Sequence, residues 1–460
     1  MTRKDQGSPS PAEVGYPLFG RRKLLVGAAG AVGIGAVIAA CGSDDEPAST
    51  EAATDDAPAG TEAAAAEEPD DDLGMVTFGS NYSDEVPKAG LAAAIAATGI
   101  NAEINTVDHN TYQENFNTYI QQPDDVMAWF AGYRMRAFAS KGVVGDISDV
   151  WAADLDDDMS AGFKSASTGL DGNQYFVPFY FYAWGVHYRK SLFEENGYDI
   201  PTTWDEFLAL NAQMEADGLV PLAAANDGRW PQMGMFDMLN LRINGYDYHV
   251  SLMGGNESWD SDEVKAVFAA WEELLPYYQP DAAGRTWQDA ATALGDKSAG
   301  MYLLGNFVTS NFDPETQQDI IDDIDFFSFP EINPDHGQDA IEAPIDGFMM
   351  AASPANETGA KAMLGGLGSK QSVEGYIGED PSVVAAVSTA DTSGYNALQQ
   401  KAAELVGSAK YIAQFLDRDT DPDFAANVVG VALADFLANP SDIDTILATV
   451  EEQAQTYTFE

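Results

Sequence analysis

The chain has 460 residues, and its 22 Lys and Arg against 74 Asp and Glu give a formal net charge of -52. A field of that sign repels nucleic acid and anionic solutes, so we expect neutral or cationic partners and no nucleic-acid ligand. Adaptation to a salty exterior, where counterions screen repulsion between carboxylates, explains the acidity better than a function that needs acid groups.

The N-terminal segment has the pattern of an export signal. A basic triplet, 21–23, precedes an apolar run, 24–40, that ends in Ile-Ala-Ala directly before Cys41. The run is too short for the roughly 20 residues of a membrane span, and its order of basic, apolar and small residues is typical of a cleaved signal peptide. The junction resembles the lipobox of bacterial lipoproteins, in which the cysteine is lipidated and becomes the mature N-terminus. We therefore expect 1–40 to be the signal peptide, exported by the Sec or the twin-arginine route.

The segment 41–72 predicts a lipidated cysteine followed by a tether. Residues 42–72 are acidic and contain no aromatic residue, Lys or Arg, so they favour a disordered, extended chain. Cys41 is the only cysteine, which excludes an intrachain disulfide. The sequence thus predicts a lipoprotein whose folded body, 73–460, is held off the outer face of the cell membrane.

The body opens with alternating strand and helix patterns. A short apolar strand at 75–79, a helical pattern at 84–97 and a second strand at 100–107 predict a β-α-β unit. A loop at 123–125 then leads into a buried strand at 126–129. This alternation predicts a doubly wound α/β sheet with ligand sites at the carboxyl ends of its strands.

Aromatic and β-branched residues dominate 175–188, which we predict to be one long strand passing between two lobes. Thr203 and Glu206 have the spacing of a capping box, and a second amphipathic helix begins at Ser261. Further elements are predicted as a helix end at 137–146, a strand at 301–304, a crossing at 326–330, a strand at 347–352 and a largely helical segment at 424–457.

Three ordered motifs carry a family resemblance: Tyr-Phe-Val-Pro-Phe-Tyr at 175–180, Tyr-Arg-Lys-Ser-Leu-Phe at 188–193 and Pro-Thr-Thr-Trp-Asp-Glu-Phe at 201–207. The order continues with Gly197, the segment 218–222, Trp230, Gly-Met at 300–301 and Phe-Pro at 329–330. This set resembles the maltose-binding-protein-like sugar-binding proteins, family 1, of carbohydrate ABC importers, and the likeness covers most of the body.

The resemblance implies a two-lobed periplasmic-binding-protein-like α/β fold with a hinge and an interlobe ligand cleft. Lobe 1 would combine 73–179 with 330–384, and lobe 2 would combine 180–329 with 385–460. The implied protein is a monomer that performs no chemistry and uses no cofactor or metal. By closing its hinge it delivers a mono- or oligosaccharide to an ABC permease with a cytoplasmic ATPase.

A neutral sugar needs aromatic platforms for its C–H faces and planar polar groups for its hydroxyls. The platforms that we predict near strand ends and crossings are Trp129, Tyr133, Tyr182, Trp184 and Trp230. The predicted hydroxyl partners are Ser80, Asn81, Asp125, Asn306 and Asp346, with Gly347 beside Asp346 in a turn that resembles one at the family's cleft rim. Each aromatic residue could instead pack in a core, as we expect of Trp204, Trp259 and Trp271. The family often has an aromatic residue in place of Asn306, so this departure leaves the identity of the sugar open.

Two alternatives remain open at this point. An exported glycosidase would also use carboxylates and aromatics, and a polyamine receptor of the same fold would suit the negative field. The four histidines, His109, His187, His249 and His336, lack the spacing of a metal site, so surface or hydrogen-bonded positions are expected. The alternating aspartates at 417–423 lack the glycine and glutamate of a calcium loop, which predicts a solvated acidic turn.

Overall fold

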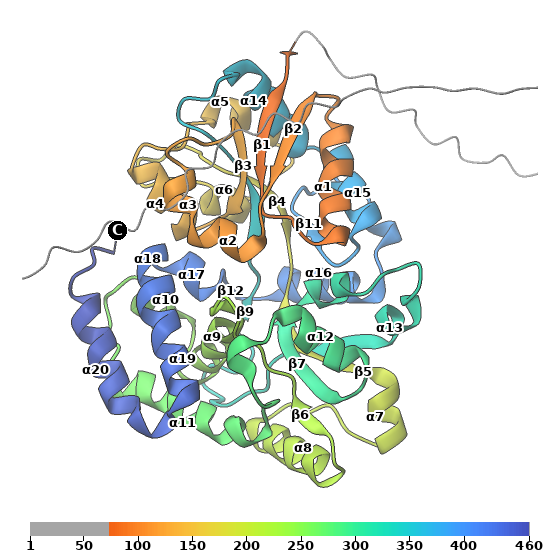
Figure 1. Cartoon of the computed structure of the whole chain (residues 1–460), viewed down its shortest axis with the longest axis vertical. Helices are drawn as coiled ribbons and strands as arrows, with labels where there is room; N and C mark the ends of the chain where they lie inside the picture. Colours follow the sequence, from red (N-terminus) through yellow and green to blue (C-terminus); the bar gives the residue numbers. More distant parts are fainter. Residues whose placement is uncertain (1–72, 460) are drawn as a thin grey trace, which may run out of the picture. The chain divides into compact units, whose positions relative to one another are not determined.

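The computed structural model describes residues 73–459 and shows two β-sheets, each flanked by its own helices (Figure 1). This arrangement confirms the predicted two-lobed α/β class. The export signal, Cys41 and the tether, all predicted within 1–72, lie outside the described residues. Within 73–459, every helix is too short or too polar to span a membrane.

The first sheet has the strand order β11-β4-β10-β3-β1-β2. β1 is parallel to β2 and β3, whereas β10 is antiparallel to β3 and β4. Its strands are β1 (Val76–Ser80), β2 (Ala102–Thr106), β3 (Val126–Phe130), β4 (Val177–Phe181), β10 (Ile345–Met350) and β11 (Val384–Ala385). The accompanying helices are α1 (Glu85–Ala97), α2 (His109–Glu114), α3 (Phe116–Tyr119), α4 (Tyr133–Ser140), α5 (Ser148–Val150), α6 (Ala161–Ala166), α14 (Glu357–Leu367) and α15 (Lys370–Glu379). The β-α-β opening predicted from the sequence is therefore confirmed.

The second sheet has the order β6-β7-β5-β8. Its strands are β5 (Trp184–Arg189), β6 (Val220–Leu222), β7 (Ala299–Gly305) and β8 (Ile324–Phe327). The helices around it are α7 (Lys190–Asn196), α8 (Trp204–Ala216), α9 (Met233–Ile243), α10 (Tyr246–Met253), α11 (Asp262–Leu274), α12 (Trp287–Gly295), α13 (Gln318–Asp323), α16 (Ala397–Ser408), α17 (Leu416–Asp419), α18 (Pro422–Phe424), α19 (Gly430–Ala438) and α20 (Ile443–Ala454). The predicted capping box is confirmed, because Thr203 and Glu206 bond each other's backbone at the start of α8.

The predicted long strand at 175–188 is wrong, because two shorter strands occupy it. β4 ends at Phe181 in the first sheet, and β5 begins at Trp184 in the second. The two residues between them, Tyr182 and Ala183, carry the chain from one sheet to the other. The backbone carbonyl of Ala183 accepts a hydrogen bond of 3.0 Å from the Asn306 N–H, which ties this crossing to the end of β7.

The return path from β8 to β10 passes through a small parallel sheet of β9 (Ala340–Glu342) and β12 (Tyr411–Ala413). Arg242 on α9 is buried and donates to the carbonyl oxygens of Phe329, at 3.0 Å, and Ala340, at 2.7 Å. This part of the crossing is therefore held against α9 rather than against the first sheet. The predicted lobe boundaries stay a prediction.

Candidate ligand-binding site

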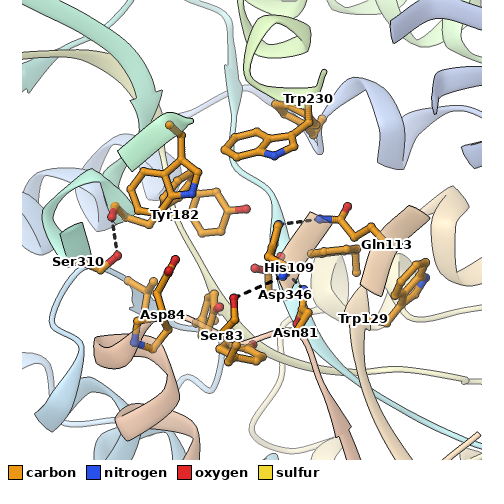
Figure 2. A pocket seen from close by; sticks show the side chains of 18 of the residues that line it. Asn81, Ser83, Asp84, His109, Gln113, Trp129, Tyr182, Trp230, Ser310 and Asp346 are labelled. Atoms are coloured by element: carbon orange, nitrogen blue, oxygen red, sulfur yellow. Dashed lines mark hydrogen bonds between the residues drawn. The ribbon is translucent and has the colours of Figure 1, made fainter. Parts of the chain in front are cut away.

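A cavity lies between the two sheets, with a volume of about 920 Å³ that includes space open to solvent. Its polar lining consists of Asn81, Ser83, Asp84, His109, Gln113, Arg134, Ser310, Asp346, Asp380, Asp417 and Arg418. The aromatic lining consists of Tyr82, Trp129, Phe130, Tyr180, Tyr182, Trp184, Trp230, Trp287, Phe307, Tyr376 and Phe415. Figure 2 shows Trp230 and Tyr182 across an open space from Asn81 and Ser83. Apolar walls with a few convergent polar groups are typical of a small-molecule site.

The sheets themselves position these side chains. Asn81 follows β1, and Trp129 and Phe130 end β3, so neighbouring parallel strands present them at the same edge. Trp184 begins β5, and its ring lies on the backbone of α9. A Cβ atom on Gly234 would come within 2.2 Å of that ring, so only glycine leaves the space that the indole occupies.

Arg418 organises one wall of the cavity. Its guanidinium lies 2.7 Å from an Asp346 carboxylate oxygen, donates to the Tyr182 hydroxyl at 2.9 Å and sits 4.2 Å from the centre of the Phe130 ring. Burial lowers the pKa of Arg418, but Asp346, Tyr182 and Asp417 outweigh this effect and raise it above its ordinary value. Burial raises the pKa of Asp346, and Arg418 opposes that rise. The pair therefore supplies a fixed cation and a buried carboxylate in one wall of the cavity.

A chain of hydrogen bonds forms the adjoining wall. Arg134 donates to Gln113 Oε1 at 2.6 Å and lies 3.2 Å from Asp417 Oδ2. Gln113 Nε2 lies 2.6 Å from His109 Nε2, and the Asn81 amide lies 3.2 Å from His109 Nδ1. Burial and the nearby cations Arg134 and Arg418 lower the pKa of His109 to about 4. The imidazole is therefore neutral near pH 7, which lets its Nε2 accept a hydrogen bond from the Gln113 amide.

Several buried polar atoms of this lining have no hydrogen-bond partner among residues 73–459. They are Trp184 Nε1, Arg134 Nε, Arg418 Nε and Asp417 Oδ1. The last two form an ion pair of 3.9 Å, which is too long for a hydrogen bond. Buried polar groups rarely remain unpaired, because each lost hydrogen bond costs roughly 1–3 kcal/mol. Three donors and one acceptor on residues that line a single cavity suit a ligand carrying several hydroxyl groups.

Side chains from the two halves of the fold meet at the edge of this cavity. Asn110 on α2 donates to Asp227 at 3.2 Å and accepts from Trp230 Nε1 at 3.2 Å. Gln288 on α12 donates to Asp84 at 3.0 Å. These bonds hold the cavity edge together in the arrangement that the structure describes.

Six of the eleven predicted ligand-binding residues line the cavity: Asn81, Trp129, Tyr182, Trp184, Trp230 and Asp346. Trp129 does not serve as the predicted aromatic platform for a sugar ring. Phe116 stacks on its ring with the centroids 3.6 Å apart, and the Arg134 guanidinium lies 5.1 Å from its centre. Little of its ring face remains for a ligand, so Trp129 supports Arg134 instead.

The other five predicted residues do not line the cavity, and each has a structural role. Asp125 accepts from the backbone N–H groups of Thr77, Ala355 and Asn356, which fixes the start of β3. Ser80 is buried and accepts from the Tyr82 N–H, Tyr133 begins α4, and Asn306 is buried with its amide 3.4 Å from the Leu398 carbonyl. Gly347 lies within β10 rather than in a turn, and a Cβ there would come 2.0 Å from the Val177 carbonyl oxygen.

The sequence reasoning missed most of the charged lining. The solvated acidic turn predicted at 417–423 is wrong for its first residue, because Asp417 is buried beside Arg134. Arg134 and Arg418 were not predicted, although only 22 basic residues accompany 74 acidic ones. An arginine close to aromatic residues in so acidic a chain is the sequence signal that could have predicted these two arginines as site residues.

His109 is hydrogen-bonded, as expected, but it lines the cavity. Within 73–459, no cluster of three or more His, Cys, Asp and Glu residues could hold a metal ion.

Comparisons with known proteins agree with this architecture. An ABC transporter extracellular-binding protein of Pyrococcus horikoshii is 24% identical over 54% of this chain and 55% of its own. A probable sugar-binding periplasmic protein of Mesorhizobium japonicum is 25% identical over 50% of this chain and 52% of its own. The matched region thus spans about half the length of these curated relatives.

Solved structures match over more of the chain. The bacterial solute receptor AcbH superimposes with a TM-score of 0.80 and 42% identity, covering 84% of this chain and 99% of its own. The GacH receptor of Streptomyces glaucescens matches with a TM-score of 0.67 at 14% identity, over 83% of this chain and 97% of its own, and so supports the fold alone. The sequence model of the bacterial extracellular solute-binding proteins matches residues 82–374. This match covers more than half of the chain, and the protein therefore belongs to the bacterial extracellular solute-binding protein family.

Proposed function

We propose that the protein is an extracytoplasmic receptor for a neutral monosaccharide, which it delivers to an ABC import permease driven by a cytoplasmic ATPase. The observation that carries this proposal is an aromatic-lined cavity among whose lining residues Trp184 Nε1 and Arg134 Nε have no hydrogen-bond partner within 73–459 and Arg418 Nε and Asp417 Oδ1 meet only as an ion pair of 3.9 Å. A pyranose offers both C–H faces for the rings and hydroxyls for those atoms.

A galactose-type ligand is the first candidate. The AcbH receptor, 42% identical to this chain, is described as having an exclusive preference for β-D-galactopyranose. Curated relatives named as sugar-binding proteins point to the same ligand class. We therefore expect D-galactose, or a sugar that differs from it at one centre, to bind.

The pairing of the charged groups in the cavity argues against a cationic ligand. Asp84 accepts a hydrogen bond from Gln288, and Asp380 accepts from Tyr376 and Ser382. Two arginines, Arg134 and Arg418, already pair with Asp417 and Asp346. A polyamine would have to compete with both guanidinium groups, although the net charge of the chain would attract it from a distance. A neutral ligand meets no such competition.

The structure also favours a sugar receptor over a glycosidase. Hydrolysis requires one carboxylic acid ready to give up its proton and a second carboxylate as nucleophile or base. Here Asp346 and Asp417 are each held by an arginine, and Asp84 and Asp380 are held by hydrogen bonds from neighbouring side chains. The family consists of binding proteins. We expect the sugar to leave the site unchanged.

Thermal unfolding of the purified protein against a panel of sugars and polyamines tests this function. A ligand at about 100 times its dissociation constant stabilises the native state by about 2.7 kcal/mol. Stabilisation by D-galactose, recovered intact, is the expected result. Stabilisation by spermidine alone, consumption of a sugar, or no response to any sugar would contradict the proposal.

We propose further that ligand binding closes the two lobes and that the permease recognises the closed form. Replacing Asn110 with Ala removes two hydrogen bonds across the cavity edge, each worth about 1 kcal/mol. The expected result is roughly a 5-fold to 30-fold loss of sugar affinity and a more extended ligand-free protein in small-angle scattering.

Asn105→Ala is the matched control, because this exposed amide bonds Asp124 within the first lobe. It should leave affinity and scattering unchanged. Equal behaviour of the two variants would exclude a role for the Asn110 bonds in closure.

The family places the protein outside the cytoplasm, and we propose that Cys41 anchors it there through a lipid. The Cys41→Ser variant should lose incorporation of labelled palmitate, because it has no thiol to acylate. Ser43→Ala, two residues away, is the control and should keep the label. Wild-type incorporation of palmitate by the Cys41→Ser variant would refute the anchor.

A further inference from the structure

A second hollow lies directly behind one wall of the ligand cavity. This second chamber has a volume of about 1150 Å³, including space open to solvent. The side chains that line both spaces are Gln113, Trp129, Arg134, Trp230 and Asp417, and we call this shared wall the partition. Two spaces with five lining residues in common adjoin each other across these residues.

The outer lining of the second chamber is polar and faces solvent. It includes the exposed residues Glu114, Asn117, Arg229, Asp423 and Asn427. Amide, carboxylate and guanidinium groups of this kind suit a hydrated ligand such as a second sugar unit. The chamber therefore offers an exit path for a longer saccharide, and the partition closes that path.

Gln113 is the central link of the partition. Its oxygen accepts from Arg134 at 2.6 Å, and its nitrogen lies 2.6 Å from the neutral His109 ring. Arg134 is held in turn by the Asp417 carboxylate, at 3.2 Å, and by the rings of Trp129 and Phe130. Side chains fixed from several directions cannot swing aside without losing hydrogen bonds in a buried place.

The interlobe bonds lie beside the partition and complete the enclosure. Asn110, which lines the second chamber, bonds Asp227 and the partition residue Trp230, and Gln288 bonds Asp84. A bound sugar is thus enclosed by the partition together with these interlobe bonds.

We propose that the partition, and Gln113 above all, limits the ligand to a single sugar residue. This inference rests on the proposed sugar-receptor function and adds to it the side chains that set ligand length. The second chamber becomes a subsite for a second sugar residue once the partition is opened.

Calorimetric titration of the full chain tests this inference with D-galactose, lactose, melibiose and β-1,4-galactobiose. The wild-type protein should bind galactose and discriminate by roughly 100-fold or more against the disaccharides. In the Gln113→Ala variant, the affinity ratio of the best disaccharide to galactose should rise by about 10-fold or more. Gln121→Ala is the matched control, because this exposed glutamine lines neither space, and it should keep the wild-type ratio.

A second variant opens the partition from its other side. Arg134→Met combined with Asp417→Asn removes the ion pair without leaving one charge buried and unpaired, and it should also raise the ratio. Wild-type protein that binds a disaccharide as tightly as galactose would overturn the inference while leaving the receptor function intact. An unchanged ratio in both folded variants would overturn it as well. Wild-type protein that binds no sugar at all would instead refute the proposed function.

Discussion

Replacing Arg418 with Met is expected to abolish measurable sugar binding and to lower the free energy of unfolding by roughly 3–5 kcal/mol. The guanidinium bonds Asp346 and the Tyr182 hydroxyl, Arg418 lines the cavity, and its Nε has no hydrogen-bond partner among the described residues. Removing it takes a donor from the ligand and leaves the Asp346 carboxylate buried without its cation. Titration calorimetry and denaturant unfolding measure the two effects.

The pH dependence of this variant has a definite sign. Burial raises the pKa of Asp346 already in the wild-type protein, and the loss of Arg418 removes the group that opposes the rise. The folded variant should therefore bind a proton at Asp346 that the unfolded chain releases above its own pKa of about 4. Its stability deficit should be smallest at acid pH and grow as the pH rises through that value towards neutrality.

A paired substitution separates the effect of Arg418 on stability from its effect on sugar binding. Arg418→Met with Asp346→Asn removes both charges, so most of the lost stability should return while binding stays absent. Wild-type affinity in the single variant would show that Arg418 does not contact the ligand. An equal stability loss in the single and paired variants would show that the unpaired carboxylate is not the cause.

Replacing Trp184 with Phe is expected to weaken sugar binding by roughly 10-fold without lowering stability by more than about 1 kcal/mol. Trp184 lines the cavity, and its indole Nε1 is buried and has no hydrogen-bond partner among the described residues. The substitution therefore removes a donor that serves the ligand rather than the fold. A benzyl ring retains the contact with Phe415, whose ring centre lies 5.0 Å away.

Trp204→Phe is the control for this change of ring. Trp204 is half-buried at the start of α8 and packs near Phe207 and Phe329, outside the cavity lining. Its replacement should leave sugar affinity at the wild-type value. If both variants bind as the wild type does, the Trp184 N–H makes no bond to the ligand.

Local sequence signals predicted the elements whose causes are local. The apolar periodicity of the first β-α-β unit and the Thr203–Glu206 capping box both need only neighbouring residues. The run 175–188 was wrongly predicted to be one strand, because β4 and β5 have the same aromatic and β-branched composition. The break at Tyr182 and Ala183 arises because the two strands pair with different sheets, and those partners are distant in sequence.

The binding site was predictable in its aromatic part and not in its charged part. Tyr182 and Trp184 flank the crossing, where any two-lobed fold places a cleft. The sequence around Asp417 predicts one of several solvated acids. In the fold, α17 packs against α4 and α9, and this packing places Asp417 beside Arg134. Asn306 follows a strand end as predicted, but its side chain turns toward Leu398 and is buried.

The structure of the protein crystallised with D-galactose tests the central claim most directly. The account predicts one sugar in the cavity between the two sheets, with ring oxygen or hydroxyl groups within hydrogen-bond distance of Trp184 Nε1 and of Arg418. Galactose bound elsewhere, or a sugar-filled cavity in which Trp184 and Arg418 make no bond to it, would contradict the account.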